Sequence, residues 1–458
     1  MHPLSNLFAV ALAGIMLALL AFDLRRGVVR VLSGRSAVLV AVMYWYVLEA
    51  LKLPKDLEIY SQSEYNFGLF CVLLSVLAFL AAYHQSRLDL FGAIARRLPI
   101  LDEPGVLLRL VLAGMAIGLG SLLIYVDFNP VSFFEGITGL SARWTGSLVR
   151  GRYGSWRTVL YEMQMFLEAS LPLAVALAFK KEAPVGRRVF SALFVLWMIL
   201  RQFSTGARTP LVPIVLCIAA AIFWRSGARV RRLLIVVGIP VGLVAGYCAA
   251  AMIVAGRNEG KLELDAVKTE YVGTEMFREL LFVIHAEDHG MAPQYGMTYF
   301  TQLVNPIPRA IWPGKPVADA GLILARAYGA VWKDGEPTMT IAPGFLGEAY
   351  MNFAFLGLII VPAAAGVIVR SWDRLLPMAL KSLPALLVYA TGLARIYASG
   401  RSVNFSTFYG LFALFALLIA IDKMRRSKSG PPRRQILVVR RPQAVGARFP
   451  QAVTRSKL

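Results

Sequence analysis

Long apolar runs recur along this chain, and many are close to the roughly 20 residues that an α-helix needs to cross the hydrocarbon core of a bilayer. Hydrophobic residues form 57% of the sequence and charged residues only 16%. This pattern predicts an all-α polytopic membrane protein with about eleven transmembrane helices. The expected spans are residues 4–22, 36–53, 66–84, 105–126, 160–179, 189–205, 209–224, 233–255, 341–369, 376–394 and 403–421.

The basic residues fall at the ends of these runs. A net charge of +21 would suggest a nucleic-acid partner in a soluble protein, but short cytoplasmic loops of membrane proteins carry lysine and arginine in excess. Basic clusters follow the odd-numbered spans, namely Arg25, Arg26, Arg30 and Arg35, then Arg87, Arg96 and Arg97, then Lys180, Lys181, Arg187 and Arg188, then Arg225, Arg229, Arg231 and Arg232, then Arg370 and Arg374. We therefore expect no nucleic-acid partner, and a multi-pass protein of the bacterial inner membrane with a periplasmic N-terminus and a cytoplasmic C-terminus.

Residues 1–421 are expected to form a single helical bundle, and residues 422–458 a basic, disordered cytoplasmic tail. Within the bundle, residues 256–340 form the longest polar stretch, a large periplasmic loop between spans eight and nine. In this loop Met276, Leu280 and Ile284 share one face of a helix. That helix either lies along the membrane surface or packs on the bundle.

Arginines in two predicted external loops oppose the usual charge preference of membrane proteins. The first loop interleaves arginines with aromatic residues, namely Arg143, Arg150, Arg152 and Arg157 with Trp144, Tyr153 and Trp156. Guanidinium groups suit phosphate, so this loop either binds an anionic ligand or merely touches lipid phosphates. In the second, "STGARTP", Arg208 lies where a helix begins, which indicates an anion site or an arginine that snorkels to the interface.

The run "LVNPIPRAIWPGKP", residues 303–316, cannot be transmembrane helix, because proline removes backbone donors and clashes with the preceding turn. Its prolines stiffen the segment, so we expect Arg309 and Lys315 to be held over the membrane surface. Trp312 is expected to anchor at the headgroups or to line a sugar path. Arg257 and Arg401 are further external charges.

This run, extended to "YGMTYFTQLVNPIPRAIWPGKP", resembles the Pro-Arg, Trp-Pro and Lys-Pro stretch of the Wzy-type O-antigen polymerases, the oligosaccharide repeat-unit polymerases. "STGARTPLV" and "PGFLGEAYMNFAFLG" are similar to two further motifs of that family, although Ala354 stands where glycine is usual. The resemblance covers residues 190–370 by motif and the rest by topology. It implies a metal-independent glycosyltransferase with a GT-C-like bundle, which joins undecaprenyl-pyrophosphate-linked oligosaccharides of an O-antigen, lipopolysaccharide or exopolysaccharide outside the membrane. Membrane lipid, a chain-length regulator and a flippase are the partners it implies, without a cofactor.

Glycosyl transfer needs a general base for the acceptor hydroxyl and fixed positive charge for the pyrophosphate leaving group. The sequence carries no Asp-x-Asp pair to hold a divalent ion, so arginines are expected to supply that charge. Glu348 is the first candidate base because ionisable groups in apolar spans are costly and commonly functional, and His289 is the second. The catalytic candidates are Glu348, Arg309, Arg208 and His289, and the substrate-binding candidates are Arg143, Arg150, Arg152, Arg157, Arg257, Lys315, Trp312, Tyr299 and Arg401.

Two other functions remain open at this point. An O-antigen ligase would use the same donor, with a similar number of spans and a large external loop. A transporter or flippase would also have many spans, but its charges usually gather near the bilayer midplane, often within internal repeats. Here the charges cluster outside and no repeat is evident, which favours the enzyme.

Overall fold

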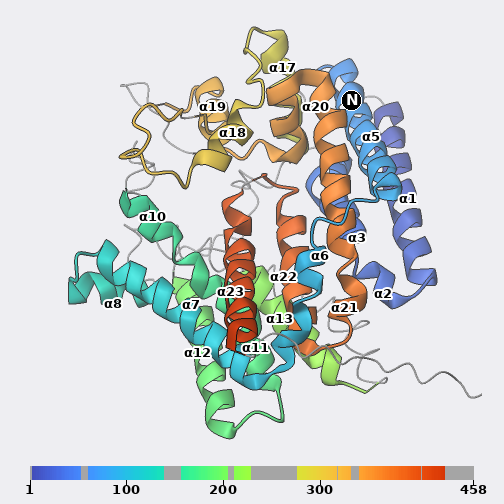
Figure 1. The fold of residues 1–458 in the computed structure, drawn as a ribbon. Helices are drawn as coiled ribbons and strands as arrows, with labels where there is room; N and C mark the ends of the chain where they lie inside the picture. The colour runs from blue at the N-terminus through green and yellow to red at the C-terminus, as the bar shows by residue number, and fades with distance from the viewer. Residues whose placement is uncertain are drawn as a thin grey trace, which may run out of the picture.

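The computed structural model describes residues 3–52, 60–138, 156–204, 211–227, 276–316, 318–331, 340–403 and 405–428. That part of the chain is built from helices and contains no β-strand, which confirms the all-α prediction (Figure 1). The longer helices are α1 (Pro3–Arg25), α3 (Gly34–Val42), α5 (Gln62–Gln85), α7 (Pro104–Tyr125), α11 (Met165–Phe179), α12 (Val185–Ser204), α13 (Leu211–Arg225), α20 (Gly344–Asp373), α22 (Leu383–Ala398) and α23 (Ser406–Lys428).

Seven helical segments of the described chain are long and apolar enough to cross a membrane. They are Leu7–Arg25, Gly34–Leu51, Gln62–Gln85, Pro104–Tyr125, Val159–Phe179, Gly344–Ala379 and Thr407–Ser427, and two shorter apolar helices are Pro213–Arg225 and Leu383–Ala398. The second segment continues from α3 through the π-helical turn η1 (Met43–Val47) into α4 (Leu48–Lys52). The expected span 189–205 corresponds to the amphipathic α12, and the expected span 233–255 lies outside the described residues.

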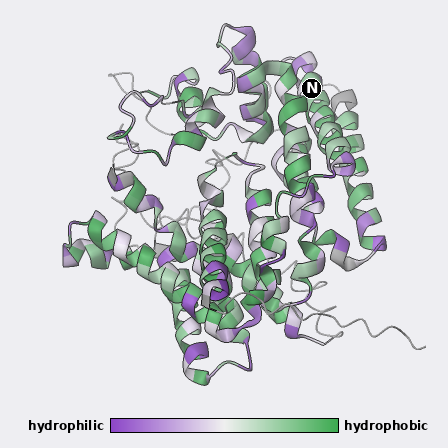
Figure 2. Ribbon diagram, in the orientation of Figure 1, coloured by the Kyte–Doolittle hydropathy of each residue, from purple (hydrophilic) through white to green (hydrophobic). Residues whose placement is uncertain are grey.

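The helices pack around two large apolar cores and one small apolar cluster. One core joins α7, α11, α12, α13, α22 and α23, and the other joins α1, α3, α5, α17 (Met276–Asp288) and α20. The small cluster is formed by Phe79, Tyr83 and Val369. Small residues allow close helix contacts, since a side chain at Gly114 would overlap Ser170 of α11 and one at Gly366 would overlap the backbone of α5 at Phe79. The mostly apolar colouring of the long helices is visible in Figure 2.

The described part of the predicted polar loop, from residue 276 onward, forms short helices at one end of the bundle, shown at the top of Figure 1. They are α17 (Met276–Asp288), α18 (Met297–Val304) and α19 (Ala320–Ala327). Met276, Leu280 and Ile284 are all buried in the second core, and Glu49 accepts a hydrogen bond of 2.7 Å from the amide of Phe277. The alternative that α17 packs on the bundle is therefore the correct one.

Polar contacts at the opposite end bring together several of the predicted basic clusters. Arg35 pairs with Asp23, Arg374 donates to the carbonyl of Arg87, Lys180 pairs with Asp102, and Arg97 pairs with Asp422. Glu348 and Arg401 belong to the other end of the bundle, with α17–α19.

The short elements of the described chain are α2 (Val28–Val31), α6 (Gly92–Ala95), η3 (Leu98–Asp102), α8 (Pro130–Thr138), α10 (Trp156–Glu162) and α21 (Leu376–Ala379).

The expected span 341–369 is not one continuous helix. Phe353 and Ala354 leave the helical conformation, and Ala354 has φ 50° and ψ −142°. A side chain at Gly357 would overlap the carbonyl of Ala349, so the two segments of α20 bend against each other at this point. The break separates the segment that carries Glu348 from the apolar segment that continues to Asp373.

Helix α23 continues into the region assigned to the tail. Residues 422–428 belong to α23, and Asp422 forms ion pairs with Arg97 and Arg426. The ordered bundle therefore extends at least to Lys428, because the end of α23 is tied to the segment that follows α5. The rest of the expected tail, residues 429–458, lies outside the described residues.

Candidate functional site

Glu348 is fully buried near the start of α20 and is surrounded by neutral hydrogen-bond donors. Its Oε1 accepts hydrogen bonds of 2.9 Å from Thr298 Oγ1 and of 2.9 Å from Gln302 Nε2, both on α18. The backbone amide of Val403 also faces the carboxylate. Its other oxygen, Oε2, is buried and has no aligned hydrogen bond within the described chain. One carboxylate oxygen is thus fixed by two side chains, and the other has no such partner within the described chain.

Asn352 and Gln302 hold this arrangement in place. Asn352 Nδ2 donates to Thr298 Oγ1 at 2.7 Å and to the carbonyl of Glu348 at 2.8 Å, which leaves the Thr298 hydroxyl proton for Glu348. Gln302 Oε1 accepts from the amide of Phe405 at 3.0 Å, which turns its amino group toward the glutamate. Three segments far apart in sequence therefore fix a single carboxylate.

Tyr299 lies on the same short helix as Thr298 and Gln302. Its hydroxyl is buried and has no hydrogen-bond partner among the described residues. Burial, and next the negative charge of Glu348, raise the pKa of Tyr299 well above its usual value. Tyr299 therefore keeps its proton and remains a hydrogen-bond donor beside the buried carboxylate.

The proline-rich run continues directly from α18. Lys315 differs from the expectation for a surface cation, because it is buried and donates to the carbonyls of Asn305 and Ile307, each at 2.9 Å. Burial and the nearby charge of Arg309 lower the pKa of Lys315. Trp312 packs edge-on against Phe300 of α18, with ring centroids 6.3 Å apart. The run is thereby folded on itself and fastened to the helix that contacts Glu348.

Arg309 is half-buried in this folded run, and its Nη1 donates to the carbonyl of Pro313 at 3.2 Å. Arg401 is exposed on the loop between α22 and α23, directly after Gly400. The carbonyl of Gly400 accepts a hydrogen bond of 3.2 Å from the amide of Phe345. Phe345 lies three residues before Glu348 in α20. The structure thus brings Glu348 and Tyr299 into one neighbourhood, bordered by the run that carries Arg309 and the loop that carries Arg401.

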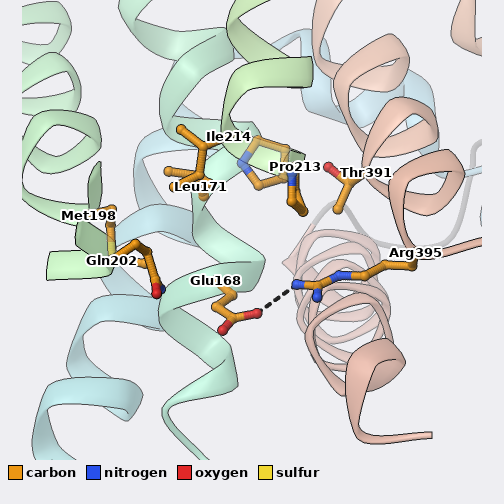
Figure 3. A pocket seen from close by; sticks show the side chains of 9 residues that line it. Glu168, Leu171, Met198, Gln202, Pro213, Ile214, Thr391 and Arg395 are labelled. Carbon is orange, nitrogen blue, oxygen red and sulfur yellow. Dashed lines mark hydrogen bonds and ion pairs between the residues drawn. The ribbon is translucent and has the colours of Figure 1, made fainter. Parts of the chain in front are cut away.

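A second buried polar site lies between α11, α12, α13 and α22 (Figure 3). Glu168 of α11 and Arg395 of α22 point toward each other, with Oε2 and Nη2 2.6 Å apart. The small pocket is lined by Glu168, Leu171, Pro172, Met198, Gln202, Pro213, Ile214, Thr391 and Arg395. Nearby, Arg201 donates to Gln164 Oε1 at 2.7 Å. These side chains line the helices on either side of residues 205–210, which lie outside the described chain.

The remaining predicted residues lie apart from Glu348 or outside the described chain. Arg157 pairs with Asp127 at 2.6 Å at the surface, where both side chains are at least half exposed. His289 follows α17, and its Nδ1 donates to the carbonyl of His285 at 2.7 Å. The residues outside the description are Arg143, Arg150, Arg152, Arg208 and Arg257.

The sequence reasoning missed the residues that support Glu348. Thr298 and Gln302 are four positions apart, as are Glu348 and Asn352, and residues at this spacing share a helix face. Two pairs of polar residues at helical spacing in otherwise apolar segments were a detectable signal. Their contact with each other was not, because it depends on how α18 packs against α20.

The helices and this site are those of a membrane-type protein with a buried carboxylate, one oxygen of which is unpaired among the described residues, next to the run that carries Arg309 and Lys315. Comparison with family models, curated proteins and solved structures finds no match to this chain.

Proposed function

We propose that this protein is a glycosyltransferase that polymerises undecaprenyl-pyrophosphate-linked oligosaccharide repeat units at the periplasmic face of the bacterial inner membrane. The observation that carries the proposal is Glu348, which is buried with one oxygen anchored by Thr298 and Gln302 and the other unpaired among the described residues. A fixed carboxylate with one available oxygen suits a general base. The proposal includes about eleven spans in a GT-C-like bundle, with the end that carries α17–α19 outside.

In the proposed reaction, a hydroxyl oxygen of the acceptor sugar attacks the anomeric carbon of the donor glycan. The bond between that carbon and the pyrophosphate oxygen breaks, and the pyrophosphate leaves with the bonding electrons. The hydroxyl proton passes to Glu348 Oε2. Tyr299 donates a hydrogen bond to a sugar oxygen, because its buried hydroxyl is otherwise unpaired within the described chain.

Positive charge is required where the pyrophosphate leaves, since negative charge increases there in the transition state. Arg309 supplies this charge in the proposal, which is supported by the contacts of Lys315 and Trp312 that hold the run carrying Arg309. Arginine offers two parallel donors to phosphate oxygens, which lysine does not. Residues outside the description, Arg208 above all, are proposed to add to this charge.

Arg309→Lys and Arg309→Ala, expressed in cells without the native gene, test this role. We expect both to be present in the membrane at normal abundance and to lose about a hundred- to a thousand-fold in rate, as for removal of one transition-state donor. The readout is the ladder of surface glycan. A full ladder from the lysine variant would mean that charge alone suffices, and a full ladder from alanine would remove Arg309 from the site.

Deletion of the gene distinguishes polymerase from ligase. A polymerase defect leaves one repeat unit on the final acceptor, whereas a ligase defect leaves finished polymer on the lipid carrier. We expect the first outcome. Accumulation of lipid-linked polymer would mean instead that the protein is a ligase, which transfers finished glycan to a different acceptor.

A further inference from the structure

An apolar cavity of about 240 Å³ lies between α3, α5, α20, α22 and α23. Aromatic rings form much of its wall, including Phe79, Trp372, Phe408, Phe412 and Phe415. Large rings in packed positions keep a cavity open, because they have few rotamers with which to collapse into it. The chemical character of this wall excludes a polar ligand and favours a hydrocarbon chain.

One end of the cavity meets the Glu348 site. Phe345, Gly400 and Phe405 line the cavity, and each is tied to that site. The amide of Phe345 donates to the Gly400 carbonyl, and the amide of Phe405 donates to Gln302, whose amino group contacts Glu348. A chain that fills the cavity would therefore end beside the carboxylate and the exposed Arg401.

The cavity also opens sideways and runs along the helices. Two of its lining residues, Ile368 of α20 and Phe412 of α23, are 50% and 54% exposed and belong to apolar membrane-type segments. The lining extends from Phe408 to Phe415 along α23, a length of roughly 10 Å at about 1.5 Å per residue. A lipid chain can thus enter from the bilayer without passing through the polar end.

We propose that this cavity binds the polyprenyl chain of the lipid-linked substrate, with the carrier phosphate at the end that carries Arg401. The inference rests on the proposed function, because a polyprenyl-linked donor needs a hydrophobic seat that ends at the reacting carboxylate. The lateral opening allows the spent carrier to leave after each transfer.

The test is photolabelling of the full-length protein in lipid nanodiscs with a diazirine-bearing polyprenyl monophosphate. We expect labelled peptides from α20, α22 and α23, and competition by unlabelled polyprenyl monophosphate but not by excess phosphatidylglycerol. Ala365 lines the cavity, whereas its neighbour Ala364 is exposed on the outer face of α20. Ala365→Trp should reduce labelling at least fivefold and Ala365→Leu partially, while Ala364→Trp should leave it unchanged.

Equal labelling of the cavity by a diazirine phosphatidylglycerol, without competition by polyprenyl phosphate, would mean that bulk lipid fills it and would overturn the inference. Labelling that Ala365→Trp and Ala365→Leu do not reduce would also overturn it. Glu348→Gln should retain full labelling because the glutamate does not line the cavity. Specific labelling in a protein that proves unable to transfer sugars would preserve this inference and refute the proposed function, so the two can fail separately.

Discussion

Glu348 and Glu168 are both glutamates in apolar helices, but their surroundings are opposite. Glu168 pairs with the guanidinium of Arg395 at 2.6 Å. Glu348 receives only neutral hydrogen bonds from side chains, from Thr298 and Gln302, and one of its oxygens is unpaired within the described chain. The ion pair links α11 to α22, whereas Glu348 is anchored by neutral donors, without an ion pair among the described residues. A carboxylate in an apolar span is therefore a candidate base only when its hydrogen-bond partners leave one oxygen unpaired.

The largest expected effect separates the two glutamates by activity. Glu348→Gln keeps the size of the side chain but cannot accept a proton, so transfer should slow by about a hundred- to ten-thousand-fold. Glu168→Gln, the matched control, should retain far more activity per folded molecule. The measurement is elongation of a lipid-linked repeat unit by purified protein. If both variants lost the same activity at equal abundance, the two glutamates would not differ in role. A normal transfer rate in Glu348→Gln would exclude Glu348 as the base.

The second effect concerns stability. Arg395→Leu leaves Glu168 without its partner, and because the Glu168 side chain is 34% exposed the loss should be smaller than the roughly 3–5 kcal/mol typical of a fully buried ion pair. We expect a marked fall in the melting temperature of the detergent-purified protein. The double variant Arg395→Leu with Glu168→Leu should recover most of it, because no buried charge is then left alone. A double variant no more stable than the single one would show that the pair does not act as a unit.

A smaller effect on stability is expected in the run of residues 303–316, which lies next to the Glu348 site. Lys315→Met removes the donor to the carbonyls of Asn305 and Ile307, which should cost about 1–3 kcal/mol for the unsatisfied acceptors. We expect faster proteolysis within residues 303–316 and reduced activity. The control Lys381→Met, at an exposed position at the other end of the bundle, should change neither. Unchanged proteolysis in Lys315→Met would mean that the prolines alone hold the run.

The smallest expected effect is a gain in stability. Ala354 adopts φ 50°, a conformation that glycine enters freely and alanine enters with strain. Ala354→Gly should therefore raise the stability by about 1 kcal/mol. Ala364→Gly, at an exposed position in the regular part of α20, should lower it by about 0.5–1 kcal/mol. Melting temperatures of the two variants test the break, and a loss in both would show that residue 354 is not strained.

The positions of most helices could be predicted from the amino-acid sequence alone. Apolar runs near membrane length have few alternatives to helix, and each expected span other than 233–255 coincides with a helix or helical segment of the described chain. The break in α20 at Phe353 and Ala354 was not predicted, since the sequence analysis expects one continuous span over residues 341–369. Local geometry is readable because helix periodicity and proline or glycine preferences act over a few residues.

Only the tertiary structure decided which polar groups became partners. Glu168 and Arg395 are 227 positions apart, and Gln302 and Phe405 are 103 positions apart. Lys315 was expected at a surface and is buried, because the run folds back far enough for its ammonium group to reach two carbonyls. Such pairings follow from the packing of helices whose apolar faces fit many partners equally well. A sequence therefore names the charged residues, but the bundle determines which are neutralised and which remain available for chemistry.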